Sequence, residues 1–334
     1  MTRRSVGQTG LTVTRFGFGC AGIAGLYQAC PTDQAMATLE AAWAAGIRYF
    51  DTAPFYGTGL SEQRLGAFLA GKPRADRVIS TKVGRLLTPV AESHAVDTGF
   101  VGGLPATVHF DYSHDAILRS VDESLIRLQT DHIDILYVHD IGAFTHGPVG
   151  AAHHMAALTR TGITALTRLR DQGVIGAWGV GVNETAVCLD LLERGPLDVI
   201  LLAGRYTLLD RQAEADLLPA CRAQGVPLVI GGVLNSGILA TGPVANARFN
   251  YDQASQDILD RVAGLERECA LAGCGLLSAA LNFPLQNPDV AAVLLGAADP
   301  ASLQQNLQAA LNQPAPQLYL DTAPFSLRAG VKAA

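Results

Sequence analysis

The 334-residue sequence has little lysine, few charged residues and no long hydrophobic run. Only three of its 24 basic residues are lysines: Lys72, Lys82 and Lys332. Charged residues make up 16% and hydrophobic residues 49%, which argues against a disordered chain. No apolar run approaches the roughly 20 residues of a membrane span. The first residues lead into polar, glycine-rich sequence rather than the apolar core of a signal peptide. These absences exclude a membrane-spanning class and leave a folded chain, in which a lysine among apolar residues needs a partner.

Metal and nucleic-acid binding are also not indicated. The six cysteines form no Cys-x-x-Cys pair, and the eight histidines, all between positions 94 and 154, match no metal-ligand spacing. We therefore expect no metal. The net charge of -6 argues against a nucleic-acid or anionic-membrane partner. Without a secretory signal, we expect reduced thiols and a cytoplasmic protein that acts on a small molecule, as a monomer or a homodimer.

Short apolar strands alternate with helices along the chain after an N-terminal hairpin at 4–14. Seven consecutive crossovers predict an α/β fold of one domain over residues 1–334, a closed (β/α)8 TIM barrel with long loops at its C-terminal rim. The Gly-, Pro- and Thr-rich stretch 83–112 is predicted to be such a loop and to form a wall of the substrate site. The eight predicted strands are 15–20, 47–50, 77–82, 133–138, 175–181, 197–202, 226–230 and 291–295.

Residues 17–22 spell G-x-G-x-x-G after the first strand, the fingerprint of a dinucleotide-binding Rossmann unit. The context does not match, because Gly25 and Pro31 intervene before the next helix. The acidic residue Asp51 also lies 34 residues after Gly17 instead of about 20. We therefore interpret the glycines as the loop above the first strand, where backbone passes close to a ligand.

Three neighbouring strands each end in a titratable residue, Asp51, Lys82 and His139, and Tyr56 follows shortly after the first of them. A lysine that ends an apolar strand needs a carboxylate, and Asp51 is the natural partner. A phenol beside an ammonium is expected to have a pKa below about 10, and a histidine can orient a substrate oxygen or relay a proton. Asp51 and Lys82 alone could be a structural ion pair. Together, the four residues favour an acid–base site for a carbonyl or alcohol oxygen.

These segments resemble the aldo-keto reductases, and the resemblance covers essentially the whole chain. It rests on GIRYFDTA at 46–53 with YG at 56–57, STKVG at 80–84 and IDILYVHD at 133–140. The resemblance implies a nicotinamide cofactor in extended form and Tyr56 as general acid/base. It also implies that Lys82 and Asp51 tune Tyr56 and that His139 positions the substrate oxygen. We expect Phe55, Tyr56, His139 and the loop residue His109 to contact substrate.

Further segments resemble the aldose 1-dehydrogenase branch, which includes L-fucose, D-threo-aldose and pyridoxal 4-dehydrogenases and implies oxidation with NAD. These segments are GGLP at 102–105, FDYS at 110–113, THG at 145–147, GRYTLL at 204–209 and NSGIL at 235–239. The expected reaction is oxidation of the anomeric hydroxyl of an aldopyranose, such as L-fucose, D-arabinose or L-galactose, to a lactone in carbohydrate metabolism. One alternative is oxidation of the cyclic hemiacetal of pyridoxal. The other is a non-catalytic cofactor-sensing subunit. The presence of the complete catalytic tetrad, which is Asp51, Tyr56, Lys82 and His139, argues against the second alternative.

The resemblance also implies a set of cofactor-binding residues, with departures from the family pattern. Gly181 stands where the family has Ser, Asn183 lies one place later than the usual Asn, and Gly231 replaces the Tyr that stacks on nicotinamide. The ring is therefore held by Tyr206 or by backbone. The full expected set is Gly19, Gly181, Asn183, Tyr206, Gly231, Ser236, Gly237, Leu239, Gly296, Ala298, Asp299, Gln305 and Asn306.

The segment after the last strand predicts NAD as the cofactor and disfavours NADP. In the family this segment often carries basic residues that bind the 2′-phosphate of NADP, but residues 295–302 contain no cation. A phosphate there would lack an arginine or lysine partner, and Asp299 would repel it. Asp299 is instead expected to accept a hydrogen bond from a free ribose 2′-hydroxyl, and Gln305 and Asn306 match the family's adenine-contacting pair.

Overall fold

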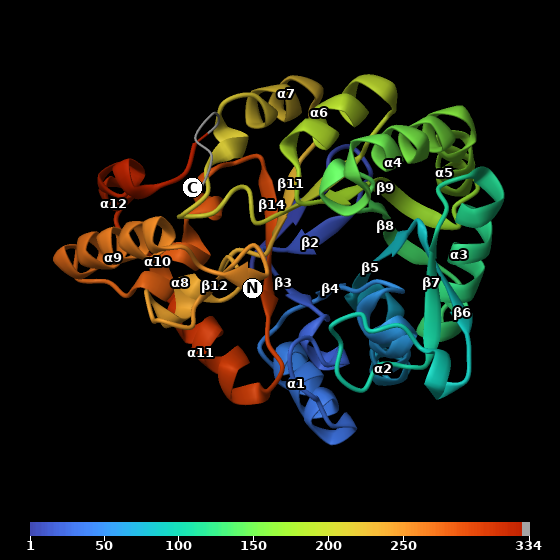
Figure 1. Ribbon diagram of the computed structural model, residues 1–334, viewed down its shortest axis with the longest axis horizontal. Helices are drawn as coiled ribbons and strands as arrows, with labels where there is room; N and C mark the ends of the chain where they lie inside the picture. Colours follow the sequence, from blue (N-terminus) through green and yellow to red (C-terminus); the bar gives the residue numbers. More distant parts are fainter. Residues whose placement is uncertain (329–334) are drawn as a thin grey trace.

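The computed structural model describes residues 1–328, so Lys332 lies outside it. Eight strands close into a barrel, which confirms the predicted fold class, and helices form the outer ring (Figure 1). Each strand pairs in parallel with its neighbours around the barrel. The barrel strands are β3 (Phe16–Gly19), β4 (Tyr49–Asp51), β5 (Val78–Val83), β8 (Ile133–His139), β9 (Ile175–Val182), β10 (Val199–Ala203), β11 (Leu228–Gly231) and β14 (Val290–Gly296).

The strands are apolar throughout because both of their faces are buried. On β8, Ile135 and Tyr137 belong to the core inside the barrel, whereas Leu136 and Val138 pack in the layer between the barrel and the helices. The helices are α1 (Thr32–Ala44), α2 (Leu60–Leu69), α3 (His114–Leu128), α4 (Ala143–Ala157), α5 (Ile163–Asp171), α6 (Thr185–Arg194), α7 (Leu217–Gln224), α8 (Ile238–Thr241), α9 (Gln256–Leu271), α10 (Leu276–Asn282), α11 (Pro300–Leu311) and α12 (Gln317–Asp321).

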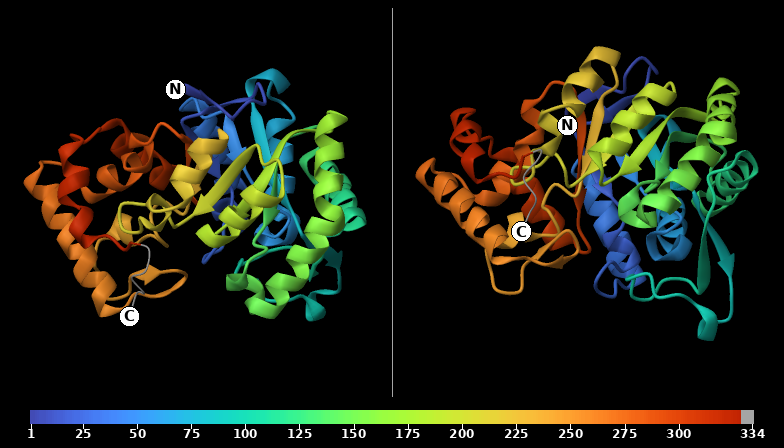
Figure 2. Two further views of the ribbon diagram at one scale, coloured as in Figure 1. Left: turned by 90° about the horizontal axis from the view of Figure 1, so that it is seen from above. Right: turned by 45° about the horizontal axis from the view of Figure 1, so that its top comes forward.

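A hairpin closes the N-terminal end of the barrel. The strands β1 (Arg3–Ser5) and β2 (Thr12–Thr14) pair antiparallel, so the hairpin predicted at 4–14 begins one residue earlier, at Arg3. Val6 and Val13 of this hairpin join the core inside the barrel, so the interior is packed at this end. The side views show the N-terminus at one end of the barrel and the orange loop after β11 at the other (Figure 2). The opposite, C-terminal end is therefore the open one.

Several loops at that rim contain more structure than predicted. The stretch 83–112 holds a hairpin of β6 (Arg85–Pro89) and β7 (Ala106–Phe110). Between β11 and α9, a small hairpin of β12 (Arg248–Phe249) and β13 (Asp252–Gln253) also forms. The helix predicted from 153 begins at Ala143, and the C-terminal tail contains α12. The short strands of these two hairpins were missed because they are too short to show a repeated apolar pattern. None of the helices within 1–328 is long and apolar enough to span a membrane.

Candidate active site

The C-terminal ends of β4 and β5 bring Asp51 and Lys82 together inside the rim. Lys82 Nζ donates to Asp51 Oδ2 at 2.8 Å and to the Thr52 carbonyl oxygen at 2.7 Å. Ser80 Oγ donates to the other carboxylate oxygen of Asp51 at 2.7 Å. Both charged side chains are almost fully buried. Burial alone would lower the pKa of Lys82, but Asp51 and Tyr56 hold it above its usual value, so the ammonium stays charged.

Tyr56 lies on the turn that follows β4, between Lys82 and His139. Lys82 Nζ is 4.8 Å from the centroid of the Tyr56 ring, and the ring centroids of Tyr56 and His139 are 6.0 Å apart. Burial raises the pKa of Tyr56 to about 12, even though the Lys82 ammonium lowers it. The expected pKa below 10 was therefore wrong for this structure, because desolvation of the phenolate outweighs the nearby charge. The phenol is protonated at neutral pH.

His139 ends β8 and is neutral. Its pKa is well below the usual value because the ring is buried and because Arg85 and Lys82 are nearby cations. Its Nε2 lies 3.3 Å from Asp140 Oδ2, and its Nδ1 has no hydrogen-bond partner among the described residues. A neutral imidazole can donate a hydrogen bond to a substrate oxygen or accept one, as the sequence predicts for this residue.

Aromatic side chains form a wall beside this group. Phe55 packs edge-to-face against Phe100 at 5.7 Å between ring centroids and against His139 at 6.4 Å. Phe100, from the long loop between β6 and β7, also stacks on Tyr56 at 5.8 Å. The structure thus places part of this predicted wall loop next to Tyr56. Phe100 was missed because a lone aromatic in a loop gives no distance information in sequence.

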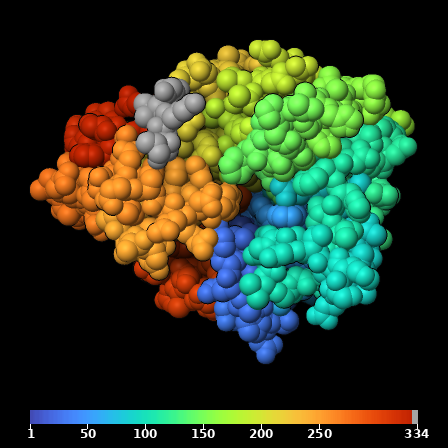
Figure 3. Space-filling model, viewed as in Figure 1, coloured from blue at the N-terminus to red at the C-terminus, as the bar shows by residue number. Residues whose placement is uncertain are grey.

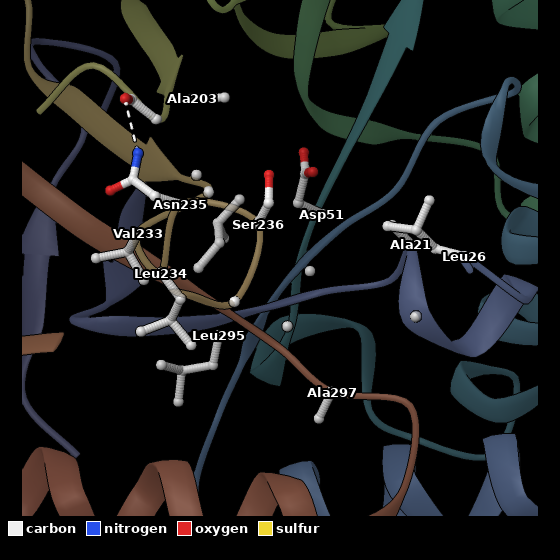
Figure 4. A pocket seen from close by; sticks show the side chains of 18 of the residues that line it. Ala21, Leu26, Asp51, Ala203, Val233, Leu234, Asn235, Ser236, Leu295 and Ala297 are labelled. Carbon is white, nitrogen blue, oxygen red and sulfur yellow. Dashed lines mark hydrogen bonds between the residues drawn. The ribbon is translucent and has the colours of Figure 1, made fainter. Parts of the chain in front are cut away.

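A cavity of about 440 Å³ extends from Asp51 and Tyr56 across the rim to Asn306 on α11. In the close-up, Val233, Leu234 and Leu295 lie on one side, Ala21 and Leu26 on the other, and Asp51 between them (Figure 4). The space-filling view shows the surface hollowed between the blue N-terminal loop and the orange segment after β11 (Figure 3). The cavity is thus elongated, with Tyr56 at one end and Asn306 at the other.

The cavity is shaped largely by glycines. A Cβ at Gly22 would lie 2.6 Å from the Ala297 carbonyl oxygen, so only glycine fits between the loops after β3 and β14. Gly231 and Gly232 both line the cavity, and Gly231 is the position at which the resemblance implies a tyrosine. The residues expected to bind cofactor that line this cavity are Gly19, Asn183, Gly231, Ser236, Gly237, Gly296, Ala298 and Asn306.

Other expected ligand contacts lie outside this cavity. Tyr206 packs on Phe283 at 5.2 Å between ring centroids and does not line the cavity. His109 is exposed on β7, 3.1 Å from Thr107 Oγ1, away from the tetrad. Gly181 lies below the rim beside the Lys82 side chain, Leu239 is buried in α8 and Gln305 is exposed on α11.

Asp299 lies at the N-terminus of α11, at the far end of the cavity from the tetrad. Its carboxylate accepts from the Ser302 backbone at 2.8 Å and from Ser302 Oγ at 2.7 Å. These hydrogen bonds lower its pKa, so the group is anionic. The segment between β14 and α11 is thus negatively charged where a 2′-phosphate would need a cation.

Two tyrosines on opposite loops also line the cavity and were not expected from sequence. Tyr27 lies on the loop after β3, and Tyr251 lies at the turn of the β12–β13 hairpin. The Tyr251 backbone N–H donates to Ser236 Oγ at 3.0 Å. The Arg248 guanidinium lies 5.7 Å from the Tyr27 ring centroid. The hairpin therefore meets the β3 loop across the cavity.

Metal-binding geometry is not found among residues 1–328, where no cluster of three His, Cys, Asp or Glu side chains is placed to hold an ion. The described cysteines are all free thiols.

Comparison with known proteins agrees with this geometry. The family model described as "Aldo/keto reductase family" matches residues 15–317. The chain is 44% identical to pyridoxal 4-dehydrogenase of Microbacterium luteolum, over 91% of this chain and 92% of the relative. It is 39% identical to D-threo-aldose 1-dehydrogenase of a Pseudomonas species, over 94% of both chains. Among solved structures, the holo form of an aldo-keto reductase from Bacillus halodurans matches with a TM-score of 0.76 and 26% identity, over 98% of this chain and 97% of that one.

Proposed function

The chain belongs to the aldo/keto reductase family of oxidoreductases, and from that premise we propose that it oxidises the anomeric hydroxyl of an aldopyranose to a lactone with NAD. The observation that carries the proposal is the position of Tyr56, between the charged Lys82 and the neutral His139 at one end of the elongated cavity. This arrangement supports proton transfer at one oxygen of a bound substrate.

Each member of the tetrad has a distinct role. Tyr56 accepts the proton of the C1 hydroxyl, and Lys82 stabilises the phenolate that Tyr56 must form first. Asp51 and the Thr52 carbonyl hold the ammonium in place. His139 hydrogen-bonds the reacting oxygen through Nε2. NAD, when bound, supplies the hydride acceptor.

NAD rather than NADP is proposed because of the charge at the far end of the cavity. The cavity ends at Gly296, Ala298 and Asn306, and the adjacent Asp299 is anionic. A ribose 2′-hydroxyl is neutral and can be accommodated there, whereas a phosphate would be desolvated beside a carboxylate. The relative named D-threo-aldose 1-dehydrogenase supports a sugar as substrate.

A second candidate is oxidation of pyridoxal, favoured by the 44% identity to pyridoxal 4-dehydrogenase. Pyridoxal forms a cyclic hemiacetal, so the same tetrad would act on a hydroxyl of the same chemical type. The two candidates differ only in the ring that carries this hydroxyl.

The test is a substrate panel read by NADH absorbance, with NAD and NADP assayed separately. L-fucose, D-arabinose, L-galactose and pyridoxal are each offered at equal concentration. We expect turnover of at least one aldose with NAD and a higher kcat/KM with NAD than with NADP. Turnover of pyridoxal alone would select the second candidate. Binding of NAD without turnover of any of the four would overturn both.

A further inference from the structure

A buried ion pair next to the tetrad has no role in the reaction described above. Arg85, at the start of β6, places Nη2 2.5 Å from Asp140 Oδ2. Their side chains are 9% and 19% exposed. The Arg85 guanidinium also lies 4.0 Å from the centroid of the Phe55 ring. Arginine thus fixes the position of the Asp140 carboxylate, since both its charge and its flat face are in contact with neighbours.

The Asp140 carboxylate lies beside His139, the residue proposed to bind the reacting oxygen. Its Oδ2 is 3.3 Å from His139 Nε2, the nitrogen that meets the reacting oxygen in the proposed function. Asp140 also has a left-handed backbone, with φ 46°, a conformation that aspartate adopts more readily than most residues other than glycine. An oxygen bound at His139 Nε2 would therefore lie next to a carboxylate whose position Arg85 fixes.

The charges and aromatic rings around this position favour a neutral, hydroxyl-rich ligand. Lys82 is paired with Asp51 and Arg85 with Asp140, so neither cation is left to attract a phosphate or carboxylate. Phe55, which lies against the Arg85 guanidinium, and Phe100, which packs on Phe55, supply apolar surface near this ion pair. A sugar ring presents both C–H groups, which pack on aromatic rings, and hydroxyls, which donate to a carboxylate.

We propose that Asp140 binds the hydroxyl on the carbon adjacent to the oxidised one, with Arg85 as its positioning residue. The inference rests on the proposed function, because it uses C1 of an aldopyranose as the reacting carbon. The two oxygens of a vicinal diol are separated by about one hydrogen-bond length. One hydroxyl can therefore form a hydrogen bond with His139 Nε2 while the other donates a hydrogen bond to Asp140. The site selects unphosphorylated aldoses that carry a 2-hydroxyl.

The experiment combines one substitution in the protein, at Asp140, with the removal of one hydroxyl from the substrate. Wild type and Asp140→Asn are assayed with L-fucose and 2-deoxy-L-fucose, with NAD saturating. Asparagine tolerates the left-handed backbone, but its neutral amide lacks the negative charge that makes the carboxylate a strong hydrogen-bond acceptor. We expect kcat/KM for L-fucose to fall by about 10- to 100-fold, the range for one hydrogen bond to a charged group. For 2-deoxy-L-fucose, we expect a change of less than about 3-fold.

Asp131→Asn is the matched control, because Asp131 is exposed and precedes β8 whereas Asp140 follows it. It should leave both substrates unaffected. Equal losses on the two substrates in Asp140→Asn would overturn the proposal and assign Asp140 a general structural role. Failure of wild type on every aldose would instead count against the proposed function, so the two failures are distinguishable.

Wild type alone provides a second test if Asp140→Asn does not fold. Removal of the 2-hydroxyl from L-fucose should lower kcat/KM by at least about 10-fold. Removal of a distant hydroxyl, by comparison of L-galactose with its 6-deoxy form L-fucose, should change it less. Equal sensitivity to both hydroxyls would contradict a specific contact at Asp140.

Discussion

The two ends of the active-site cavity are built in opposite ways. At the corner of β4, β5 and β8, charged and polar side chains are buried and paired, as Lys82 with Asp51 and Arg85 with Asp140. In the cavity between β11, β14 and β3, many of the lining residues are glycines and other apolar residues, and charged side chains are few. The first region depends on groups that are present, and the second depends on side chains that are absent.

This difference determines how each region should respond to mutation. In the catalytic corner, removal of a functional group leaves a partner unsatisfied and removes chemistry, so losses are large and appear in kcat. In the cavity, addition of an atom narrows the space for cofactor, so losses are smaller and appear in the KM for NAD. The following substitutions test this contrast, from the largest expected effect to the smallest.

Tyr56→Phe should lower kcat by about 10³-fold, because it removes the hydroxyl that is proposed to take the substrate proton. The KM for NAD should stay within about 2-fold, since the ring is retained. The pH dependence gives a second measurement. A base must be unprotonated, so wild-type oxidation should rise as the pH approaches the pKa of Tyr56, about 12 in this structure, and the variant should lose that rise.

Tyr206→Phe is the control for Tyr56→Phe, because Tyr206 is also a buried phenol but lies outside the cavity against Phe283. Its kcat and KM for NAD should both match wild type. A large rise in the KM for NAD would instead show that Tyr206 reaches the nicotinamide. Full turnover by Tyr56→Phe would refute the assignment of the base.

Lys82→Met should lower kcat by about 10²-fold and shift the rise in rate to higher pH. The Lys82 ammonium lowers the pKa of Tyr56, so its loss makes the phenolate harder to form. The variant also leaves Asp51 buried without its cation, which should cost about 3–5 kcal/mol in the free energy of unfolding. Thermal denaturation and a pH–rate profile measure the two effects.

Lys72→Met provides the same substitution at a partly exposed site. Lys72 pairs with Glu40 at 2.8 Å, and Glu40 is 57% exposed. Such a pair contributes only about 0–1 kcal/mol. Activity should be unchanged and the melting temperature nearly so. An equal loss of stability in the two lysine variants would show that the buried Asp51–Lys82 pair contributes no more to the free energy of unfolding than an exposed ion pair does.

Gly22→Ala tests the expectation that an atom added to the cavity wall raises the KM for NAD. Its Cβ would lie 2.6 Å from the Ala297 carbonyl oxygen, so the loop after β14 must shift. We expect the KM for NAD to rise by about 10-fold, with kcat within about 3-fold, as overpacking costs about 1–3 kcal/mol. Gly71→Ala is the control, because no atom lies within 4 Å of its added Cβ. A fall in kcat without a change in KM would contradict the contrast between the two regions.

The same contrast explains what could be predicted from sequence. Asp51, Lys82 and His139 were predictable because each ends an apolar strand, and parallel strands bring their C-terminal ends to one rim. Gly22 was predictable as part of the glycine-rich loop above the first strand, whereas Gly231 was predictable only as a departure from the family pattern. The cavity itself comes from distances between loops, which strand periodicity does not encode.

Contacts that join distant loops were not predictable. Arg85 meets Asp140 only because the β6–β7 hairpin folds beside the end of β8. Tyr206 carries a ring suited to stacking, but it turns into the helical layer against Phe283. The pKa of Tyr56 was expected on the wrong side of its usual value, because the sequence showed the nearby cation but not the depth of burial.

The smallest expected effect comes from placing a charge in the cavity region, at Ala298→Arg. Ala298 is half-buried and lines the end of the cavity, next to the anionic Asp299. A guanidinium there would give a 2′-phosphate its missing partner. Because the position is partly solvated, we expect a gain of only about 5-fold in the NADP-to-NAD ratio of kcat/KM, equivalent to about 1 kcal/mol.

Salt and a neutral control separate charge from added bulk in this last case. The gain from Ala298→Arg should shrink as ionic strength rises, since exposed charges are screened. Ala298→Gln adds a long side chain without charge and should leave the cofactor ratio unchanged. If glutamine raises the ratio as much as arginine, or if wild type already prefers NADP, then charge does not set cofactor choice here. The cavity would then discriminate by shape alone, which would make the contrast with the charged corner complete.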